Sequence, residues 1–137
     1  MEEVGLRRAF LLPPEDLEFL DARGLAWEAL IEGNLRWVLL HKFPIPQGYN
    51  VSEADIAIQL PDSYPSTQLD MVYVFPALGL ARGRPIGAAD VRQSLDGQSY
   101  QRWSRHRTPD NPWRSNIDYL GTHVGLIEEW FLKETKK

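Results

Sequence analysis

The sequence contains no cysteine in its 137 residues. This absence excludes disulfide bonds, thiolate metal sites and every mechanism that requires a thiol nucleophile. Covalent catalysis by this chain would therefore have to use an oxygen or a nitrogen atom. A chain without cysteine also suits a reducing compartment, and we expect the protein to be cytoplasmic.

The sequence also lacks long hydrophobic runs and an excess of basic residues. Its apolar runs are well short of the roughly 20 residues needed to cross a bilayer, and the acidic start Met1-Glu2-Glu3 is unlike a secretory signal. The formal net charge is −4, whereas domains that bind nucleic acid through its phosphates are usually basic. We therefore expect neither a membrane nor a nucleic acid as a partner.

What is present is typical of one globular domain. Hydrophobic residues make up 43% and charged residues 25% of the chain, close to the averages for such domains. A chain of this length can bury a single core without a metal or a disulfide to support it. We expect one domain over residues 1–137, with its core between about residues 10 and 132.

The first part of the chain predicts a short helix and a β-hairpin. Pro13-Pro14-Glu15-Asp16 places proline and acids in a first helical turn, and Gly24 is a natural stop. Two β-prone runs, 27–31 and 35–43, flank the turn Glu32-Gly33-Asn34. In the second run we take one alternating face for the core, namely Leu35, Trp37, Leu39, His41 and Phe43.

Two more strands are predicted further along the chain. Residues 54–60 and 69–75 are rich in apolar side chains, and residues 61–66 between them have turn chemistry. Four consecutive strands with short connections indicate an antiparallel meander. The next segment, residues 77–99, is predicted to be a long irregular loop with one or two helical turns over residues 88–95.

The C-terminal segment predicts a long helix. Ser115-Asn116-Ile117-Asp118 resembles a capping box at its start. An apolar stripe follows at helical spacing, through Ile117, Leu120, Val124, Ile127 and Phe131. The element order predicts an α+β domain: an N-terminal helix, a four-stranded antiparallel meander, a long irregular loop, and a C-terminal helix packed on one face of the sheet.

The densest recognition chemistry lies in residues 100–114. From Gln101 to Arg114, four arginines stand against one aspartate, a local net charge of +3. Because the planar arginine fork suits carboxylates, the segment is either a docking surface for a carboxylate tail or acidic partner, or a solvated face neutralised by the acidic N-terminal helix. We expect Arg102, Arg105 and Arg107 to share one edge of an extended segment.

Five residues of this segment are candidates for binding a partner: Arg102, Trp103, Arg105, Arg107 and Trp113. Tryptophan is over-represented at exposed interfaces. Aromatic side chains also bury large areas and hold loops to cores. For the two tryptophans both interpretations remain open.

Ser104 and His106 are the candidate catalytic residues. They are two positions apart and so lie on the same side of an extended chain. A serine activated by a histidine can form an ester with a carboxyl group, but no acid that would orient His106 is identified, and such a spacing is common by chance. Of the other histidines, His41 is expected to be partly buried and hydrogen-bonded, and His123 to lie on the flank of the last helix. Three scattered histidines without cysteine make a poor metal site, so we expect no metal and no cofactor.

The strand at residues 54–60 and the turn after it resemble a known family. Leu60-Pro61-Asp62-Ser63-Tyr64-Pro65 is similar to the Phe-Pro-x-x-Tyr-Pro turn of the ubiquitin-conjugating enzyme (UBC) superfamily, and Trp113 lies where that family has a tryptophan after its active-site loop. Nearly the whole chain more closely resembles the branch called prokaryotic UBC-like family E. This closer resemblance is carried by Gly48-Tyr49-Asn50, Ala54-Asp55, Tyr64-Pro65, Leu69-Asp70-Met71, residues 97–106, Trp113 and Asp118-Tyr119-Leu120.

The resemblance implies a UBC-like fold and a place in a bacterial pathway that conjugates ubiquitin-like proteins. Operons of that branch also encode an activating enzyme and a deconjugating protease. A role in antiphage defence is implied by these neighbouring genes alone. In catalytic members a cysteine precedes the tryptophan at a spacing that falls here on Arg105. The His-Pro-Asn segment that precedes the cysteine in eukaryotic members is also missing.

Cysteine-less relatives in eukaryotes act as binding subunits. We therefore expect a non-catalytic UBC-like protein that binds the ubiquitin-like protein, the activating or conjugating enzyme, or both. The alternative is an active transferase in which a Ser104 oxyester replaces the cysteine thioester.

Overall fold

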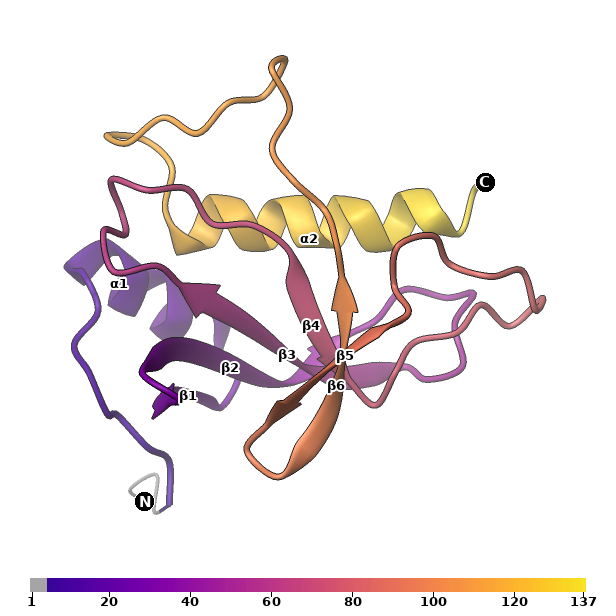
Figure 1. Cartoon of the computed structure of the whole chain (residues 1–137), viewed down its shortest axis with the longest axis horizontal. Coiled ribbons are helices and arrows are strands. Elements are labelled where there is room, and N and C mark those ends of the chain that lie inside the picture. The colour runs from indigo at the N-terminus through magenta and orange to yellow at the C-terminus, as the bar shows by residue number, and fades with distance from the viewer. Residues whose placement is uncertain (1–4) are drawn as a thin grey trace.

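A computed structural model describes residues 5–137 as two helices and a six-stranded antiparallel sheet (Figure 1). This confirms the predicted α+β class, which is compatible with a UBC-like fold, but with six strands instead of four. Neither helix in this described part is long and apolar enough to cross a membrane. The elements are α1 (Pro14–Arg23), β1 (Trp27–Glu32), β2 (Leu35–Pro44), β3 (Glu53–Leu60), β4 (Val72–Phe75), β5 (Val91–Leu95), β6 (Gln98–Trp103) and α2 (Leu120–Glu134).

The helix α1 and the hairpin β1–β2 form as their sequences predict. Proline and acids occupy the first turn of α1, and Gly24 ends it in the left-handed region at φ 77°. The tight turn of the hairpin places Gly33 at φ 60° and Asn34 at φ 63°, the conformation that matches the twist of antiparallel strands. Strands β1 to β4 then pair in order, as the predicted meander requires.

The segment after β4 differs from the prediction. The full order is β1-β2-β3-β4-β6-β5, so a second hairpin joins the sheet through β6. Helical turns over residues 88–95 were a wrong prediction, because β5 lies there. The overlooked signal is Asp96-Gly97, a two-residue turn with φ of 52° and 76°, which favours a hairpin between flanking strands.

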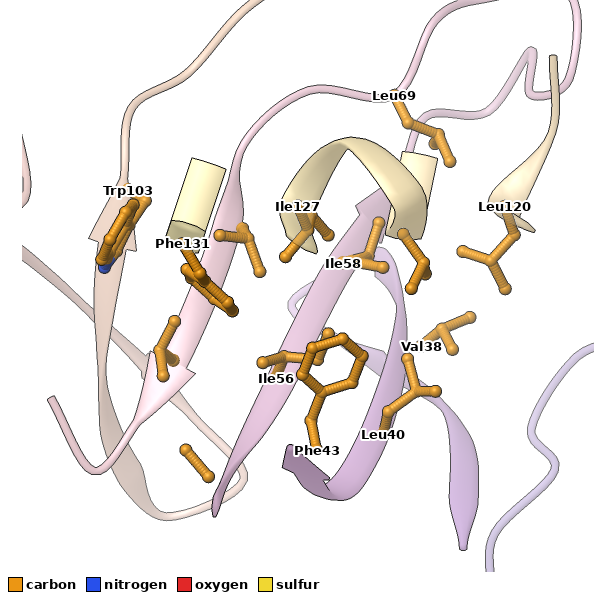
Figure 2. Packing of buried hydrophobic residues seen from close by; sticks show 14 of the residues in the cluster. Val38, Leu40, Phe43, Ile56, Ile58, Leu69, Trp103, Leu120, Ile127 and Phe131 are labelled. Carbon is orange, nitrogen blue, oxygen red and sulfur yellow. The ribbon is translucent and has the colours of Figure 1, made fainter. Parts of the chain in front are cut away.

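Helix α2 lies along one face of the sheet, and its apolar stripe faces the strands (Figures 1 and 2). Four predicted stripe residues are fully buried: Leu120, Val124, Ile127 and Phe131. The predicted capping box was wrong, because α2 begins only at Leu120 with Tyr119 as its cap. Ile117 therefore lies before the helix and is 58% exposed.

Strand β2 is buried on both faces, so choosing a single core face was wrong. Val38 and Leu40 pack in the main core beneath α2, whereas Trp37 and Leu39 lie in a second cluster on the other face. The hairpin β5–β6 supplies Leu95 and Tyr100 to that second cluster. A bulge after Leu40 shifts the register and returns Phe43 to the main core.

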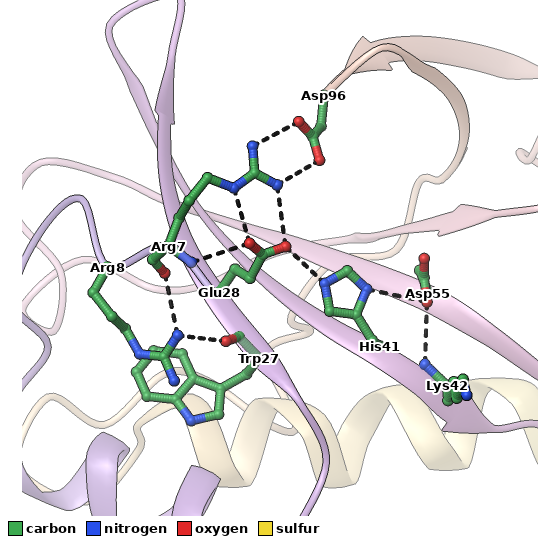
Figure 3. Close-up of polar contacts among 8 residues, drawn as sticks. All are labelled: Arg7, Arg8, Trp27, Glu28, His41, Lys42, Asp55 and Asp96. Carbon is green, nitrogen blue, oxygen red and sulfur yellow. Dashed lines mark hydrogen bonds and ion pairs between the residues drawn. The ribbon is translucent and has the colours of Figure 1, made fainter. Parts of the chain in front are cut away.

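An ion-pair cluster joins the two ends of this curved sheet (Figure 3). The Arg7 Nε atom lies 2.8 Å from the Glu28 carboxylate on β1, and its Nη2 atom lies 2.7 Å from Asp96 in the β5–β6 turn. His41 Nε2 lies 2.8 Å from Glu28, and His41 Nδ1 lies 3.3 Å from Asp55. We call these five residues the N-terminal clasp, because they hold the N-terminal arm and the last hairpin to β1.

Candidate functional site

The predicted site segment leaves the sheet at the end of β6, and its first residues are held on both sides. The Ser104 amide donates to the Ala88 carbonyl at 2.9 Å, and the Met71 amide donates to the Arg105 carbonyl at 2.9 Å. Met71 adopts φ 62°, a left-handed conformation that is uncommon for a non-glycine residue. His123 of α2 contacts the Met71 carbonyl at 2.9 Å, so neighbouring elements hold this conformation.

Trp103 lies in the core and not at the surface. Its side chain is fully buried, and its indole N–H donates to Gln101 at 2.9 Å. Its ring meets Phe131 of α2 edge-on at 5.0 Å. Of the two interpretations of this tryptophan, the core one therefore agrees with its position. The residue holds the end of β6 against α2 (Figure 2).

Arg105 is tied to the C-terminal end of α2. Its guanidinium lies over the Trp103 ring at 4.9 Å and donates to the Gly87 carbonyl at 3.0 Å. It also lies 3.3 Å from Glu134, which is 2% exposed and 2.9 Å from Arg84. Burial opposes charge on Glu134, but hydrogen bonds from Arg84 and Lys137, together with the charges of Lys137 and Arg105, hold its pKa below the usual value.

Arg107 and Trp113 contact each other and hold the loop between β6 and α2 in place. The Arg107 side chain is 5% exposed, lies over the Trp113 ring at 5.1 Å and is 3.7 Å from Asp118. Burial disfavours the charged Asp118 carboxylate, yet the Arg114 backbone amide donates to it at 2.8 Å and its pKa is lowered. The Trp113 indole donates to the Pro65 carbonyl at 2.9 Å and is half-buried.

Arg102 points to the opposite face of β6 from Trp103, because side chains alternate along a strand. Its cross-strand neighbours are Tyr73 on β4 and Val91 on β5. Its Nε donates to the Ser104 hydroxyl oxygen at 3.1 Å. The expectation that Arg102, Arg105 and Arg107 share one edge was therefore wrong, since the latter two turn toward α2 and Trp113 while Arg102 faces the other way.

Ser104 and His106 are not joined by a hydrogen bond in the described chain. Instead, His106 Nδ1 lies 3.7 Å from an Asp70 carboxylate oxygen, and the Gln68 amide donates to both oxygens of that carboxylate, at 3.2 and 3.0 Å. Sequence reasoning assigned Asp70 no site role, because its proximity to His106 arises only when β4 pairs with β6. Asp70 also lines a hollow of about 180 Å³ with Gln59, Pro61, Gln68, Met71 and Tyr73.

The two remaining histidines differ from each other. His41 is partly buried and contacts two carboxylates, as expected. His123 is fully buried instead of lying on a helix flank, and burial lowers its pKa to about 4. Its Nε2 faces a carbonyl and must donate, so its unpartnered Nδ1 is an acceptor. Over residues 5–137, no three histidine or carboxylate side chains gather as a metal site.

The sequence model of the family described as "Prokaryotic E2 family E" matches residues 12–134. The chain belongs to prokaryotic E2 family E. Membership supports a role related to ubiquitin conjugation and confirms the resemblance drawn from the sequence motifs. No curated protein and no solved structure matches the chain. Several residues that carried the resemblance meet in the folded chain, notably Asp70 with His106 and Tyr64 with Trp113.

Proposed function

We propose that this member of prokaryotic E2 family E is a non-catalytic subunit of a bacterial ubiquitin-like conjugation pathway. It would bind the ubiquitin-like protein, the activating or conjugating enzyme, or both. The absence of cysteine is the observation that carries the proposal, because the thioester of an E2 reaction requires a thiolate.

The surroundings of Arg105 support this proposal. At the spacing where catalytic relatives have their nucleophile, the chain has a guanidinium packed on Trp103 and bonded to Gly87 and Glu134. Such a side chain stabilises the loop and offers no nucleophilic atom. Arg105 therefore makes structural interactions at the position where an E2 enzyme has a reactive side chain.

The predicted partner-binding residues divide into two groups. Trp103, Arg105 and Arg107 are committed to the core or to buried carboxylates, so they would act by holding the loop in shape. Arg102 and part of Trp113 remain accessible to a partner. The docking surface we propose is therefore the exposed side of β6 and of the loop that follows it.

The Ser104 oxyester is the second candidate function. The contact between His106 and Asp70 favours it, because a carboxylate near Nδ1 can orient a histidine for base catalysis. The observation against it is that Ser104 accepts a hydrogen bond from Arg102 and makes none with His106. Attack by Ser104 would therefore need the two side chains to rearrange.

A charging assay tests both candidates. The protein is incubated with the ubiquitin-like protein and activating enzyme of its operon and ATP, then separated on a denaturing gel and by native size exclusion. Our proposal expects co-elution and no covalent adduct. Ser104→Ala and Ser99→Ala serve as a matched pair, because each removes one accessible hydroxyl. Ser99 lies on β6, and Ser104 follows it directly.

A hydroxylamine-sensitive adduct on the wild type and on Ser99→Ala, but not on Ser104→Ala, would establish the transferase and reject our proposal. The absence of both an adduct and co-elution with any partner would reject both functions.

A further inference from the structure

We propose that Arg102 and Ser104 form a receptor for the C-terminal carboxylate of the ubiquitin-like protein. This inference rests on the function proposed above and specifies which partner group is recognised. We call this pair the carboxylate receptor.

Arg102 differs from the other arginines of its segment in having no acidic partner. Arg105 lies 3.3 Å from Glu134, and Arg107 and Arg114 lie 3.7 and 3.5 Å from Asp118. Within residues 5–137 no carboxylate lies within ion-pair distance of Arg102. A half-buried cation without a counter-ion favours an anion from outside the chain.

The hydrogen bond between Arg102 and Ser104 leaves the useful donors free. Arg102 uses its Nε atom to hold the serine oxygen, so its two terminal nitrogens have no hydrogen-bond partner in the described chain. Ser104 accepts that bond and so keeps its own O–H to donate. Two guanidinium nitrogens and one hydroxyl can therefore meet the two oxygens of a carboxylate.

The position of Arg102 in the sheet suits an extended tail. Its neighbour Val91 is 47% exposed and lies on β5, the outermost strand at that side. At the other side of the sheet, the arm covers β1 through backbone bonds of Ala9 and Arg7 to Ala29. An extended chain can therefore approach across Val91 and place its C-terminal carboxylate on Arg102. An acidic side chain on a rigid partner would have to fit the sheet surface more closely.

Asp70, the acid in the adjoining hollow, does not occupy this receptor. Its carboxylate accepts two hydrogen bonds from Gln68 and lies beside His106. Arg102 is not among the residues that line the hollow, and it is available to an incoming carboxylate.

The test is a binding titration of the full chain with the operon's ubiquitin-like protein, without ATP. The ubiquitin-like protein is used in two forms, one ending in a free carboxylate and one in a carboxamide. We expect the carboxamide to bind at least about tenfold more weakly. Arg102→Gln should lose a similar factor for the carboxylate form and nothing further for the carboxamide, because the two changes remove the same interaction.

Arg92→Gln is the matched control. Arg92 is exposed on the adjacent strand and donates to the Ser99 carbonyl at 3.4 Å, so we expect less than a twofold change. Ser104→Ala should weaken binding of the carboxylate form by a smaller factor than Arg102→Gln. Thermal unfolding of each variant checks that the fold is kept.

Equal binding of the two tail forms would overturn the receptor while leaving the proposed function intact. Equal loss in Arg92→Gln and Arg102→Gln would reduce the effect to general charge and also overturn it. If the ubiquitin-like protein does not bind at all but the activating enzyme co-elutes, the receptor is rejected and the binding-subunit proposal stands.

Discussion

The N-terminal clasp and the carboxylate receptor both place an arginine on the face of the sheet away from α2, but their charges are matched differently. Arg7 in the clasp contacts two carboxylates, Glu28 and Asp96. Within residues 5–137, the Arg102 side chain in the receptor hydrogen-bonds to a hydroxyl and to no carboxylate. Charge pairing that is complete within the chain stabilises the fold, whereas an unmatched charge remains available to a partner. The clasp should therefore respond to mutation in stability, and the receptor in binding.

The largest expected effect is on the clasp. Glu28 is 5% exposed, and the bonds from Arg7 and His41 hold its pKa at about 2 despite burial. Glu28→Ala would leave Arg7 and His41 without this partner and should lower the free energy of unfolding by about 3 kcal/mol. Chemical denaturation at pH 7 measures this. Glu53→Ala, an exposed acid on β3, should change it by no more than about 0.5 kcal/mol; equal losses would contradict a special role for the clasp.

The next effect concerns His123, which is fully buried on α2. Its folded pKa of about 4 lies below its unfolded value, so the unfolded state binds more protons and stability falls as the pH drops from 6.5 toward 4. Between pH 7 and pH 5 the wild type should lose about 2 kcal/mol more than His123→Gln does. Denaturation curves at both pH values test this. His106→Gln, at an exposed position, should follow the wild type.

The clasp histidine should respond to pH in the opposite direction. Burial alone would lower the pKa of His41, but its bonds to Glu28 and Asp55 raise it overall. Its stabilising contribution is therefore complete below the unfolded pKa and is lost as the pH rises through the folded value. His41→Gln should cost about 1 kcal/mol at pH 6 and less at pH 9. A cost that grows with pH would contradict a charged His41 in the clasp.

The smallest stability effect is expected at the receptor. Arg102→Gln should alter the free energy of unfolding by no more than about 0.5 kcal/mol, because no acid loses its partner. Arg7→Gln should cost about 1 kcal/mol, since Glu28 and Asp96 lose the charged hydrogen bonds of a half-exposed guanidinium. Thermal and chemical unfolding of the two variants side by side give the comparison. A larger loss for Arg102→Gln would place that arginine among the structural residues.

Local patterns predicted the regular parts of this fold well. Proline and glycine bounded α1, Gly33-Asn34 gave the first hairpin, and the stripe on α2 faced the core. The second hairpin was missed although Asp96-Gly97 is a strong turn signal. Its strands β5 and β6 are mostly polar and have few apolar residues, so the hydrophobic periodicity that revealed the other strands is faint there.

The site was less predictable because its contacts join distant parts of the chain. Arg7 and Asp96 are 89 positions apart, and no periodic pattern reports such a pair. Ser104 and His106 have the spacing for a shared side, yet each finds a different partner, Arg102 or Asp70. Spacing restricts which side chains could meet, while the pairing of β4 with β6 decides which ones do.

The contacts of Arg105 also determine what a cysteine at this position would require. Replacing it with cysteine would remove a cation from Glu134, a carboxylate that is 2% exposed at the end of α2. The new thiol would also begin in a position built to face Trp103 and the helix instead of solvent. A cysteine at position 105 would therefore need compensating changes in α2, so a single substitution would not be enough to place an accessible thiol there.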